Sequence, residues 1–306
     1  MGHIGNDKEE VYGYLAERLN KNPVGAPVNE VLMEILHGLY TESEAMVGSK
    51  FLMLPMTLDK IANITGVAED TLKKTLESMS VKGLVMDLSF PDGTYYMLTL
   101  MMVGFFGLTF MRVRDEINMK ELAEVFTIYL QKPGVWEEFF GSDTKELRAM
   151  VYESLIPAVV DTEVLIYERA SEVIRQSGGG SLSMYACRHR AGHLGKSCAA
   201  NGPIEDVCTS FGLAAQWLVR RGTGRVATVD ELLRVLDQTT KLGLVHLGDN
   251  VLNEPTFLCH CCGCCCVALH PSREYNTLPA QPSNFIPSLG SRYLLRLRYL
   301  RRKLPG

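Results

Sequence analysis

The nine cysteines of this chain all lie in its second half, and they restrict what that half can be. None precedes Cys187, and six fall within the eight residues of 259–266. Adjacent side chains on an extended chain point to opposite faces, so packing alone does not call for such a run. Thiols exposed in a cell would also be open to oxidation. The pattern therefore indicates a site for a metal or a cluster rather than ordinary buried cysteines.

Nothing at the start of the sequence predicts export. Residues 1–10 are polar and charged where a signal peptide requires an apolar core. We therefore expect a cytoplasmic protein, and clustered cysteines in a reducing compartment indicate metal binding more than disulfides. The uncharged segment Tyr95–Met111 is shorter than the roughly 20 apolar residues of a membrane span. We expect it to be a buried core segment.

Local signals predict how the distant cysteines come together. Pro203 suits the first position of a helix running to Arg221, which would place Cys208 in the second turn. Thr228-Val-Asp-Glu231 is a capping box for a further helix ending near Leu242, and Leu244–His246 reads as a short strand. These elements would fold residues 259–266 back toward the three earlier cysteines.

The spacing and number of the cysteines favour iron–sulfur ligation over zinc. Ten and nine residues separate the three earlier cysteines, unlike the paired spacing of zinc knuckles. A thiolate pocket with surplus cysteines suits a 4Fe–4S cluster, one or two in number, with zinc as the alternative. All nine are candidate cofactor-binding residues, namely Cys187, Cys198, Cys208, Cys259, Cys261, Cys262, Cys264, Cys265 and Cys266. The expected metal ligands among them are Cys187, Cys198, Cys208, Cys259, Cys261, Cys262 and Cys265.

Side chains alternate between the two faces of an extended strand, which separates the six cysteines of the 259–266 run. Cys259 and Cys261 would share one side and Cys262 the other, and Gly263 permits a bend that re-aims the rest. We expect the run either to divide between two sites or to bridge one cluster with spare thiols nearby. In both cases the earlier cysteines should lie within about 7 Å of the run, because iron–thiolate bonds are short.

Histidines and arginines lie among the cysteines, and the sequence leaves their roles open. The histidines would ligate the metal, hydrogen-bond to cluster sulfur or have ordinary surface roles. The arginines would offset the negative charge of a cluster or be solvated. The residues concerned are His189, His193, His260, Arg188 and Arg190.

The cysteine-rich segment resembles a known family. Its motifs are Cys-Arg-His-x3-His-x-Gly-x2-Cys from Cys187, Pro-x4-Cys to Cys208, Gly-Leu-Val-His and Cys-x-Cys-Cys-Gly-Cys-Cys-Cys from Cys259. Over about residues 184–270 these are similar to 4Fe–4S ferredoxin-type iron–sulfur proteins of anaerobes. The family typically has a further cysteine where this chain has Tyr185, so the resemblance implies one ligand fewer. Members also usually continue into a C-terminal two-cluster ferredoxin module, which this chain lacks.

Residues 57–98 predict a winged helix-turn-helix. Helices over 57–66 and 69–81 precede two strands that meet at Pro91-Asp92-Gly93, a hairpin signal. Winged helices often bind DNA through the second helix. However, residues 1–180 carry a net charge of −11, against +7 for residues 181–306, and negative charge opposes phosphate contacts. We expect this unit to serve packing, dimerisation or docking, with DNA binding as the less favoured role.

The predicted fold is mainly α, of the α+β class, in consecutive parts. Helix starts are predicted at Asp143-Thr-Lys-Glu146 and at Asp161 or Thr162. The glycines of Ser177-Gly-Gly-Gly180 predict a flexible joint. The expected parts are a winged-helix-like domain (1–115), a helical extension (116–176), a Gly/Ser joint (177–183), a small helical cysteine-rich domain (184–270) and an irregular tail (271–306).

The tail has an unusual composition from about residue 290. With GC-rich codons, reading one base later converts Leu294, Leu297, Leu300 and Leu304 to cysteine codons ahead of Pro305. Their spacing is then that of a bacterial ferredoxin motif. We interpret residues 290–306 as an out-of-frame product, with a genuine arginine-rich tail as the alternative.

These observations favour electron transfer through one or more 4Fe–4S clusters to or from a redox partner protein. Neither a dinucleotide-binding nor a phosphate-binding glycine motif is present, so we expect a carrier or an oxidoreductase subunit rather than a stand-alone enzyme. A redox- or iron-sensing winged-helix regulator is one alternative, and a structural zinc module is another. A homodimer through the N-terminal domain is also expected.

Overall fold

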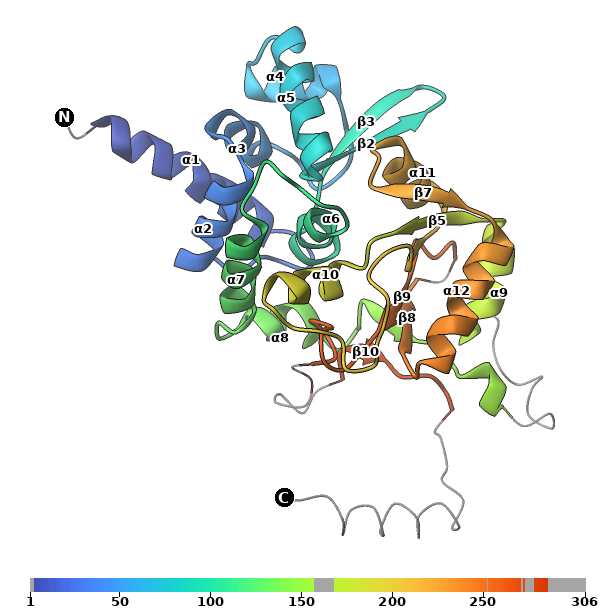
Figure 1. The fold of residues 1–306 in the computed structure, drawn as a ribbon. Coiled ribbons are helices and arrows are strands. Elements are labelled where there is room, and N and C mark those ends of the chain that lie inside the picture. The colour runs from blue at the N-terminus through green and yellow to red at the C-terminus, as the bar shows by residue number, and fades with distance from the viewer. Residues whose placement is uncertain (1–2, 157–167, 252, 271, 273–277, 286–306) are drawn as a thin grey trace.

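The structure is a computed structural model that describes residues 3–156, 168–251, 253–270, 272 and 278–285. Over these residues the chain is an α+β protein with two sheets (Figure 1). The helices are α1 (His3–Asn20), α2 (Glu30–Leu39), α3 (Glu42–Ser49), α4 (Leu58–Thr65), α5 (Glu69–Lys82), α6 (Gly107–Phe110), α7 (Met119–Leu130), α8 (Val135–Phe140), α9 (Ala170–Ser177), α10 (Ala186–His193), α11 (Gly212–Arg220) and α12 (Val229–Lys241). A π-helical turn (Met101–Phe106) and a 3₁₀ turn (Glu153–Leu155) add to them.

The strands form one small and one large sheet. Their bounds are β1 (Met56–Thr57), β2 (Val85–Phe90), β3 (Gly93–Leu98), β4 (Leu147–Ala149), β5 (Gly180–Ser183), β6 (Cys208–Ser210), β7 (Gly224–Ala227), β8 (Val245–Asp249), β9 (Phe257–Cys261) and β10 (Ala280–Gln281). The small sheet has the order β1-β3-β2, and the large sheet has the order β10-β4-β8-β9-β6-β5-β7. The large sheet is mixed, because β10 pairs with β4 in parallel whereas its other pairs are antiparallel.

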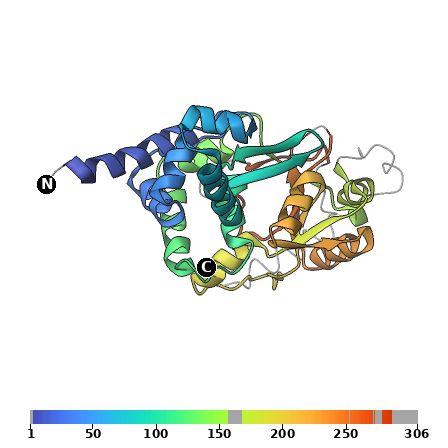
Figure 2. The same ribbon diagram turned by 90° about the horizontal axis from the view of Figure 1, so that it is seen from above.

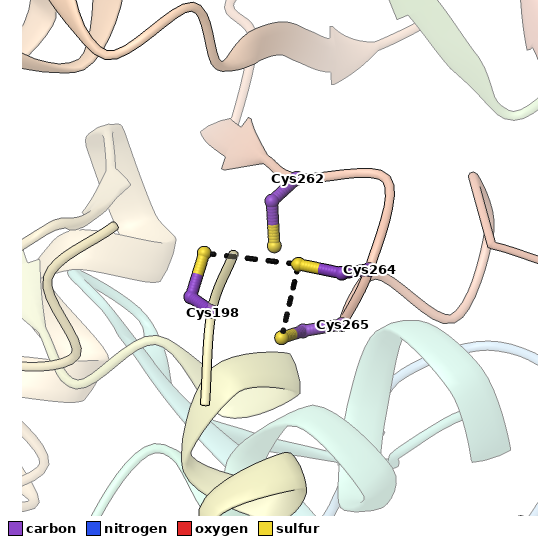
Figure 3. A group of neighbouring side chains, drawn as sticks. All are labelled: Cys198, Cys262, Cys264 and Cys265. Atoms are coloured by element: carbon purple, nitrogen blue, oxygen red, sulfur yellow. Dashed lines mark hydrogen bonds between the residues drawn. The ribbon is translucent and has the colours of Figure 1, made fainter. Parts of the chain in front are cut away.

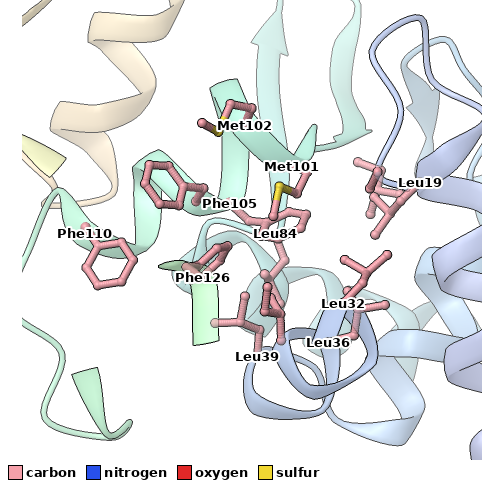
Figure 4. Packing of buried hydrophobic residues seen from close by; sticks show 14 of the residues in the cluster. Leu19, Leu32, Leu36, Leu39, Leu84, Met101, Met102, Phe105, Phe110 and Phe126 are labelled. Carbon is pink, nitrogen blue, oxygen red and sulfur yellow. The ribbon is translucent and has the colours of Figure 1, made fainter. Parts of the chain in front are cut away.

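The N-terminal helices pack around an aromatic and aliphatic core. Helix α2 begins at Asn29, whose side chain accepts hydrogen bonds from the N–H groups of Val31 and Leu32. Its apolar stripe is buried against α7, and Phe126 of α7 is fully buried at the centre of this core (Figure 4). The stripe recurs every three or four residues, the spacing of an amphipathic helix with one buried face.

The two helices and the hairpin expected over 57–98 are present as α4, α5, β2 and β3. Gly66 and Gly83 end the two helices in the left-handed conformation, which glycine adopts without steric cost. Strand β1 adds to the hairpin by pairing with β3. These elements do not by themselves show a winged helix-turn-helix domain, and that identification stays a prediction.

The uncharged segment after β3 belongs to the core. It forms the π-helical turn and α6, where Phe105, Phe106 and Phe110 are buried. In the part of the chain that the structure describes, no helix combines the length and the hydropathy needed to span a membrane.

The cysteine-rich segment is not the small helical domain that the sequence predicted. Four strands, β6 to β9, lie in it and join β5, β4 and β10 in the large sheet. The helix expected from Pro203 begins only at Gly212, and Cys208 lies on β6 instead. Despite the local helix signal, residues 208–210 form a strand, because β6 pairs with β5 on one side and with β9 on the other. By contrast, the capping box of Thr228 and Glu231 begins α12 as predicted.

A second predicted helix start is also a strand in the structure. Leu147–Ala149, expected to continue a helix from Asp143, forms β4 and pairs with β8. The Asn250 side chain donates to the Lys145 carbonyl and the Asn250 N–H donates to that of Glu146, each over 2.8 Å. These contacts span more than 100 residues, so a local pattern could not reveal them.

The glycines after α9 allow two strands to approach closely. Gly178 ends α9 in the left-handed conformation, and Gly180 begins β5. A Cβ atom at Gly180 would lie 2.2 Å from the Ser210 carbonyl oxygen, so only glycine fits there. The domain boundary proposed at this joint stays a prediction, and one hydrophobic core extends from the N-terminal helices to Tyr185 and Cys261.

The β2–β3 hairpin is attached to the cysteine-rich half. Asp87 of β2 accepts a 2.8 Å hydrogen bond from Nε1 of Trp217 on α11, and Arg221 forms a 2.7 Å ion pair with the same carboxylate. Figure 2 shows the hairpin extending toward this half of the molecule. The predicted helix start at Asp161 or Thr162 and the arginine-rich tail over 290–306 lie outside the described residues.

Candidate metal centre

Four cysteine side chains converge next to the end of β9 (Figure 3). Cys198 comes from the loop after α10, and the others come from the turn that follows β9. All four sulfur atoms lie within 4.8 Å of one another. We call Cys198, Cys262, Cys264 and Cys265 the four-cysteine group.

The four-cysteine group is enclosed on one side and accessible on the other. Cys262 and Cys265 are buried beside Ala191 and Leu244, whereas Cys198 and Cys264 are partly exposed. The Cys264 Sγ atom lies 3.8 Å from that of Cys198 and 3.6 Å from that of Cys265. A metal ion placed here would therefore be shielded from solvent on the side of Cys262 and Cys265 and approachable on the side of Cys198 and Cys264.

Backbone N–H groups favour thiolates in this group. The Ala199 N–H donates to Cys264 Sγ over 3.4 Å. Burial raises the pKa of Cys264, but this hydrogen bond and the neighbouring thiols outweigh it and lower the pKa to about 7. Burial raises the pKa of Cys198, and N–H groups of Gly202 and Ala200 partly offset that effect. A thiolate is the form that binds metal.

The other five cysteines gather around the neighbouring face of the sheet. Cys187 contacts Cys266, Cys208 contacts Cys259, and Cys261 contacts both Cys259 and Cys266. We call Cys187, Cys208, Cys259, Cys261 and Cys266 the five-cysteine group. The alternation predicted for the run thus holds, because Cys259 and Cys261 lie together whereas Cys262 joins the other group.

The nine cysteines all lie close to the 259–266 run and fall into two sets. Cys264 and Cys266, which the expected ligand list left out, each belong to a group. Tyr185 was noted in the sequence only as a missing cysteine. Its hydroxyl donates to Cys261 Sγ over 3.0 Å, so this position contacts the five-cysteine group without providing a thiolate.

The three histidines are not in the four-cysteine group. His260 lies on the face of β9 away from Cys259 and Cys261, and its Nδ1 lies 3.0 Å from Thr239 Oγ1. His189 Nδ1 lies 2.8 Å from the Phe110 carbonyl oxygen, and His193 Nε2 lies 3.1 Å from His189 Nε2. Their nitrogens thus contact other protein groups.

Arg188 and Arg190 are buried rather than solvated. Arg188 is 2% exposed and Arg190 is 9% exposed. The Arg188 guanidinium donates to the carbonyls of Pro203 and His260 and lies 3.7 Å from the ring centroid of Tyr185. Arg190 thus lies near Cys187, Cys265 and Cys266, and Arg188 is linked to the thiols through Tyr185.

A buried histidine next to this site gives the fold a pH dependence. His246 is 2% exposed, its Nε2 lies 3.2 Å from Thr239 Oγ1, and its ring stacks on Tyr152 and meets the edge of His260. Burial lowers the pKa of His246 to about 4. Between an unfolded-state pKa of about 6.5 and that value, the unfolded chain binds more protons than the folded one.

We therefore expect stability to fall as the pH drops from about 6.5 to 4, with His246 contributing up to about 3 kcal/mol. Urea unfolding at several pH values measures this, and His246→Gln should flatten the dependence. His270→Gln, at an exposed histidine, is the matched control and should leave it unchanged. An equal slope in the His246 variant and the wild type would contradict the expectation.

Comparisons of the chain with models of known protein families, with curated proteins and with solved structures found no match. No family is thereby identified. What the structure supports is a group of four cysteines that could hold a metal ion or a cluster.

Proposed function

We propose that the chain is a 4Fe–4S iron–sulfur protein that exchanges electrons with a partner protein through the four-cysteine group. The observation that carries the proposal is the convergence of four cysteine side chains, because a cubane takes four protein ligands. Thiolates are soft ligands that select zinc, copper(I) and iron–sulfur clusters. Hydrogen bonds to the sulfur atoms tune the reduction potential of such a cluster, and the Ala199 N–H provides one.

The composition of the group favours a carrier over a catalyst. Four thiolates complete the protein ligation of a cubane, whereas catalytic metal sites keep a position open for water or substrate. Cys198 and Cys264 are partly exposed, so a partner protein can approach the centre from their side. Both Cys198 and the 262–265 turn lie outside helices and strands, so they can adjust to a cluster.

The distances between the sulfur atoms favour a second candidate, a single tetrahedral ion such as structural zinc. Four zinc–sulfur bonds of about 2.3 Å place neighbouring sulfur atoms about 3.8 Å apart. The distances from Cys264 Sγ to those of Cys198 and Cys265 are 3.8 Å and 3.6 Å. A cubane holds each thiolate on a different iron, so the two segments would have to move apart to accept it.

Metal analysis of protein prepared anaerobically separates these candidates. We expect about four iron and four sulfide for this centre, with broad visible absorption that dithionite bleaches. Cys198→Ser should lose that portion of the iron, because it removes the ligand from the opposite segment. Lys196→Ser, on the same loop, is the matched control and should retain it. One zinc per chain without sulfide would overturn the iron–sulfur proposal in favour of the structural site.

The regulator remains a proposal of lower rank. It requires the α5 helix and the hairpin to reach DNA, and α5 presents Lys73 and Lys74 to solvent. The Asp87 contacts with Trp217 and Arg221, however, hold the hairpin against the cysteine-rich half, which supports a packing role. Salt-sensitive DNA binding by the metal-loaded protein alone, in a gel-shift experiment, would favour the regulator.

A further inference from the structure

Strand register places three cysteines of the five-cysteine group on one face of the large sheet. Strand β6 pairs with β9 so that Thr209 lies opposite Leu258, and the same register places Cys208 opposite Cys259. Directly opposed residues project from the same face, and Cys261 lies two residues further along β9. Paired strands thus fix these three positions before any metal binds.

Two further thiols reach this face from outside the sheet. Cys187 in the first turn of α10 and Cys266 in the turn after β9 contact each other. The Cys208 and Cys259 side chains likewise contact each other across the paired strands.

The five sulfur atoms are arranged differently from those of the first group. Among the described residues, only the four-cysteine group has all its sulfur atoms within 4.8 Å of one another. The five-cysteine group is spread along β6, β9 and α10. A cubane needs such a spread, because its four thiolates bind four different iron atoms rather than one ion.

An independent observation is a buried cation without an anion. Arg188 is 2% exposed, and within the described part of the chain it forms no ion pair and its Nη2 atom has no hydrogen-bond partner. An uncompensated buried charge costs several kcal/mol. The Arg188 guanidinium stacks on Tyr185, whose hydroxyl donates to Cys261 Sγ. The missing negative charge is therefore expected on the thiol side.

Arg190 extends the same argument to both groups. It is 9% exposed, and its Nη1 donates to the Thr127 hydroxyl while its Nε has no partner among the described residues. Its guanidinium lies near the side chains of Cys187, Cys265 and Cys266. Cys187 and Cys266 belong to one group and Cys265 to the other, so Arg190 lies beside both.

We infer that the five-cysteine group is a second metal centre, distinct from the four-cysteine group, which binds an anionic iron–sulfur cluster through four of its five thiolates. Each thiol releases its proton to solvent as the sulfur bonds to iron, and iron and sulfide come from the medium. The negative charge of the thiolate-bound cluster compensates Arg188 and Arg190. The proposed function enters only in the choice of iron as the metal.

The two centres would be direct neighbours. Cys261 and Cys262 are consecutive residues in different groups, and so are Cys265 and Cys266, with Cα atoms about 3.8 Å apart. Electrons could pass from the partly exposed four-cysteine centre to the one on the sheet. Two reduced clusters at this separation should also broaden each other's EPR signals.

The test loads the full chain anaerobically with iron and sulfide and counts both per chain. We expect about eight iron for the wild type, about four when Cys187 and Cys208 are both replaced by serine, which leaves the five-cysteine group three thiolates, and about four for Cys198→Ser. The EPR broadening should disappear in each of these variants. Far-UV circular dichroism, with Lys196→Ser as control, verifies that each variant is folded.

Arg188 provides a test that leaves every thiol in place. Arg188→Gln in a Cys198→Ser background should make the potential of the remaining cluster more negative, because it removes a nearby positive charge, and Arg188→Lys should restore part of it. Loss of all iron in Cys198→Ser, with none lost when Cys187 and Cys208 are both replaced by serine, would overturn the second centre. Loss in that double variant but none in Cys198→Ser would instead overturn the function proposed for the four-cysteine group.

Discussion

Replacing Asp87 by alanine is expected to lower the free energy of unfolding by about 3–5 kcal/mol. Asp87 is 8% exposed and accepts hydrogen bonds from Trp217 Nε1 at 2.8 Å and Arg221 Nε at 3.0 Å. Its carboxylate also forms a 3.1 Å ion pair with Arg220. The alanine variant would leave Trp217, Arg221 and Arg220 without the carboxylate that they share. A largely buried donor that loses its acceptor lowers stability by more than the hydrogen bond itself contributes.

Urea unfolding at neutral pH measures the effect, and the chain contains a matched control. Asp237 pairs with Lys241 at 2.6 Å on the surface of α12, where both side chains are more than 60% exposed. Asp237→Ala should change stability by no more than about 0.5 kcal/mol, because exposed ion pairs are screened by solvent. Equal losses in the two variants would show that Asp87 does not join the hairpin to the cysteine-rich half.

Phe126→Ala is expected to cost about 3–5 kcal/mol as well, through a cavity in the N-terminal core. The Phe126 side chain is fully buried, and its ring centroid lies 5.1 Å from that of Phe106 and 5.8 Å from that of Phe110. Both pairs have edge-to-face geometry, which adds to the value of the buried area. Helices on both sides hold these rings, so the surroundings can collapse only in part.

The control for this cavity is two residues away on the same helix. Ile128 is 49% exposed, so Ile128→Ala removes little buried surface and should cost less than about 1 kcal/mol. Thermal or urea unfolding of both variants gives the comparison. A loss below 1 kcal/mol in Phe126→Ala would mean that Phe126 is not tightly packed against Phe106 and Phe110.

Elements specified by their own residues were predictable from the sequence. The Thr228 capping box, the left-handed glycines after α4 and α5, and the apolar stripe of α2 each act within a few residues of the backbone. Such signals need no partner from elsewhere in the chain. The alternation on β9 likewise separated Cys261 from Cys262, because successive side chains of a strand point to opposite faces.

Elements that depend on distant partners could not be read locally. Pro203 favours a helix start, yet Cys208 is on a strand because β5 and β9 pair with it on either side. In the same way, the residues after Asp143 have a helix pattern but form strand β4, because they pair with β8. Hydrogen bonds to neighbouring strands outweigh a helix propensity of a few tenths of a kcal/mol per residue.

The sequence by itself determined that this protein concentrates thiols in one segment and that the segment suits a metal. Only the tertiary structure decided how the nine cysteines divide, because the register of β6 against β9 brings Cys208 to Cys259 and the loop after α10 brings Cys198 to Cys264. It also decided that Arg188 is buried beside the thiols. Neither fact has a local signal, since the cysteine contacts join residues more than 50 positions apart and Arg188 donates to the carbonyl of His260, 72 positions away.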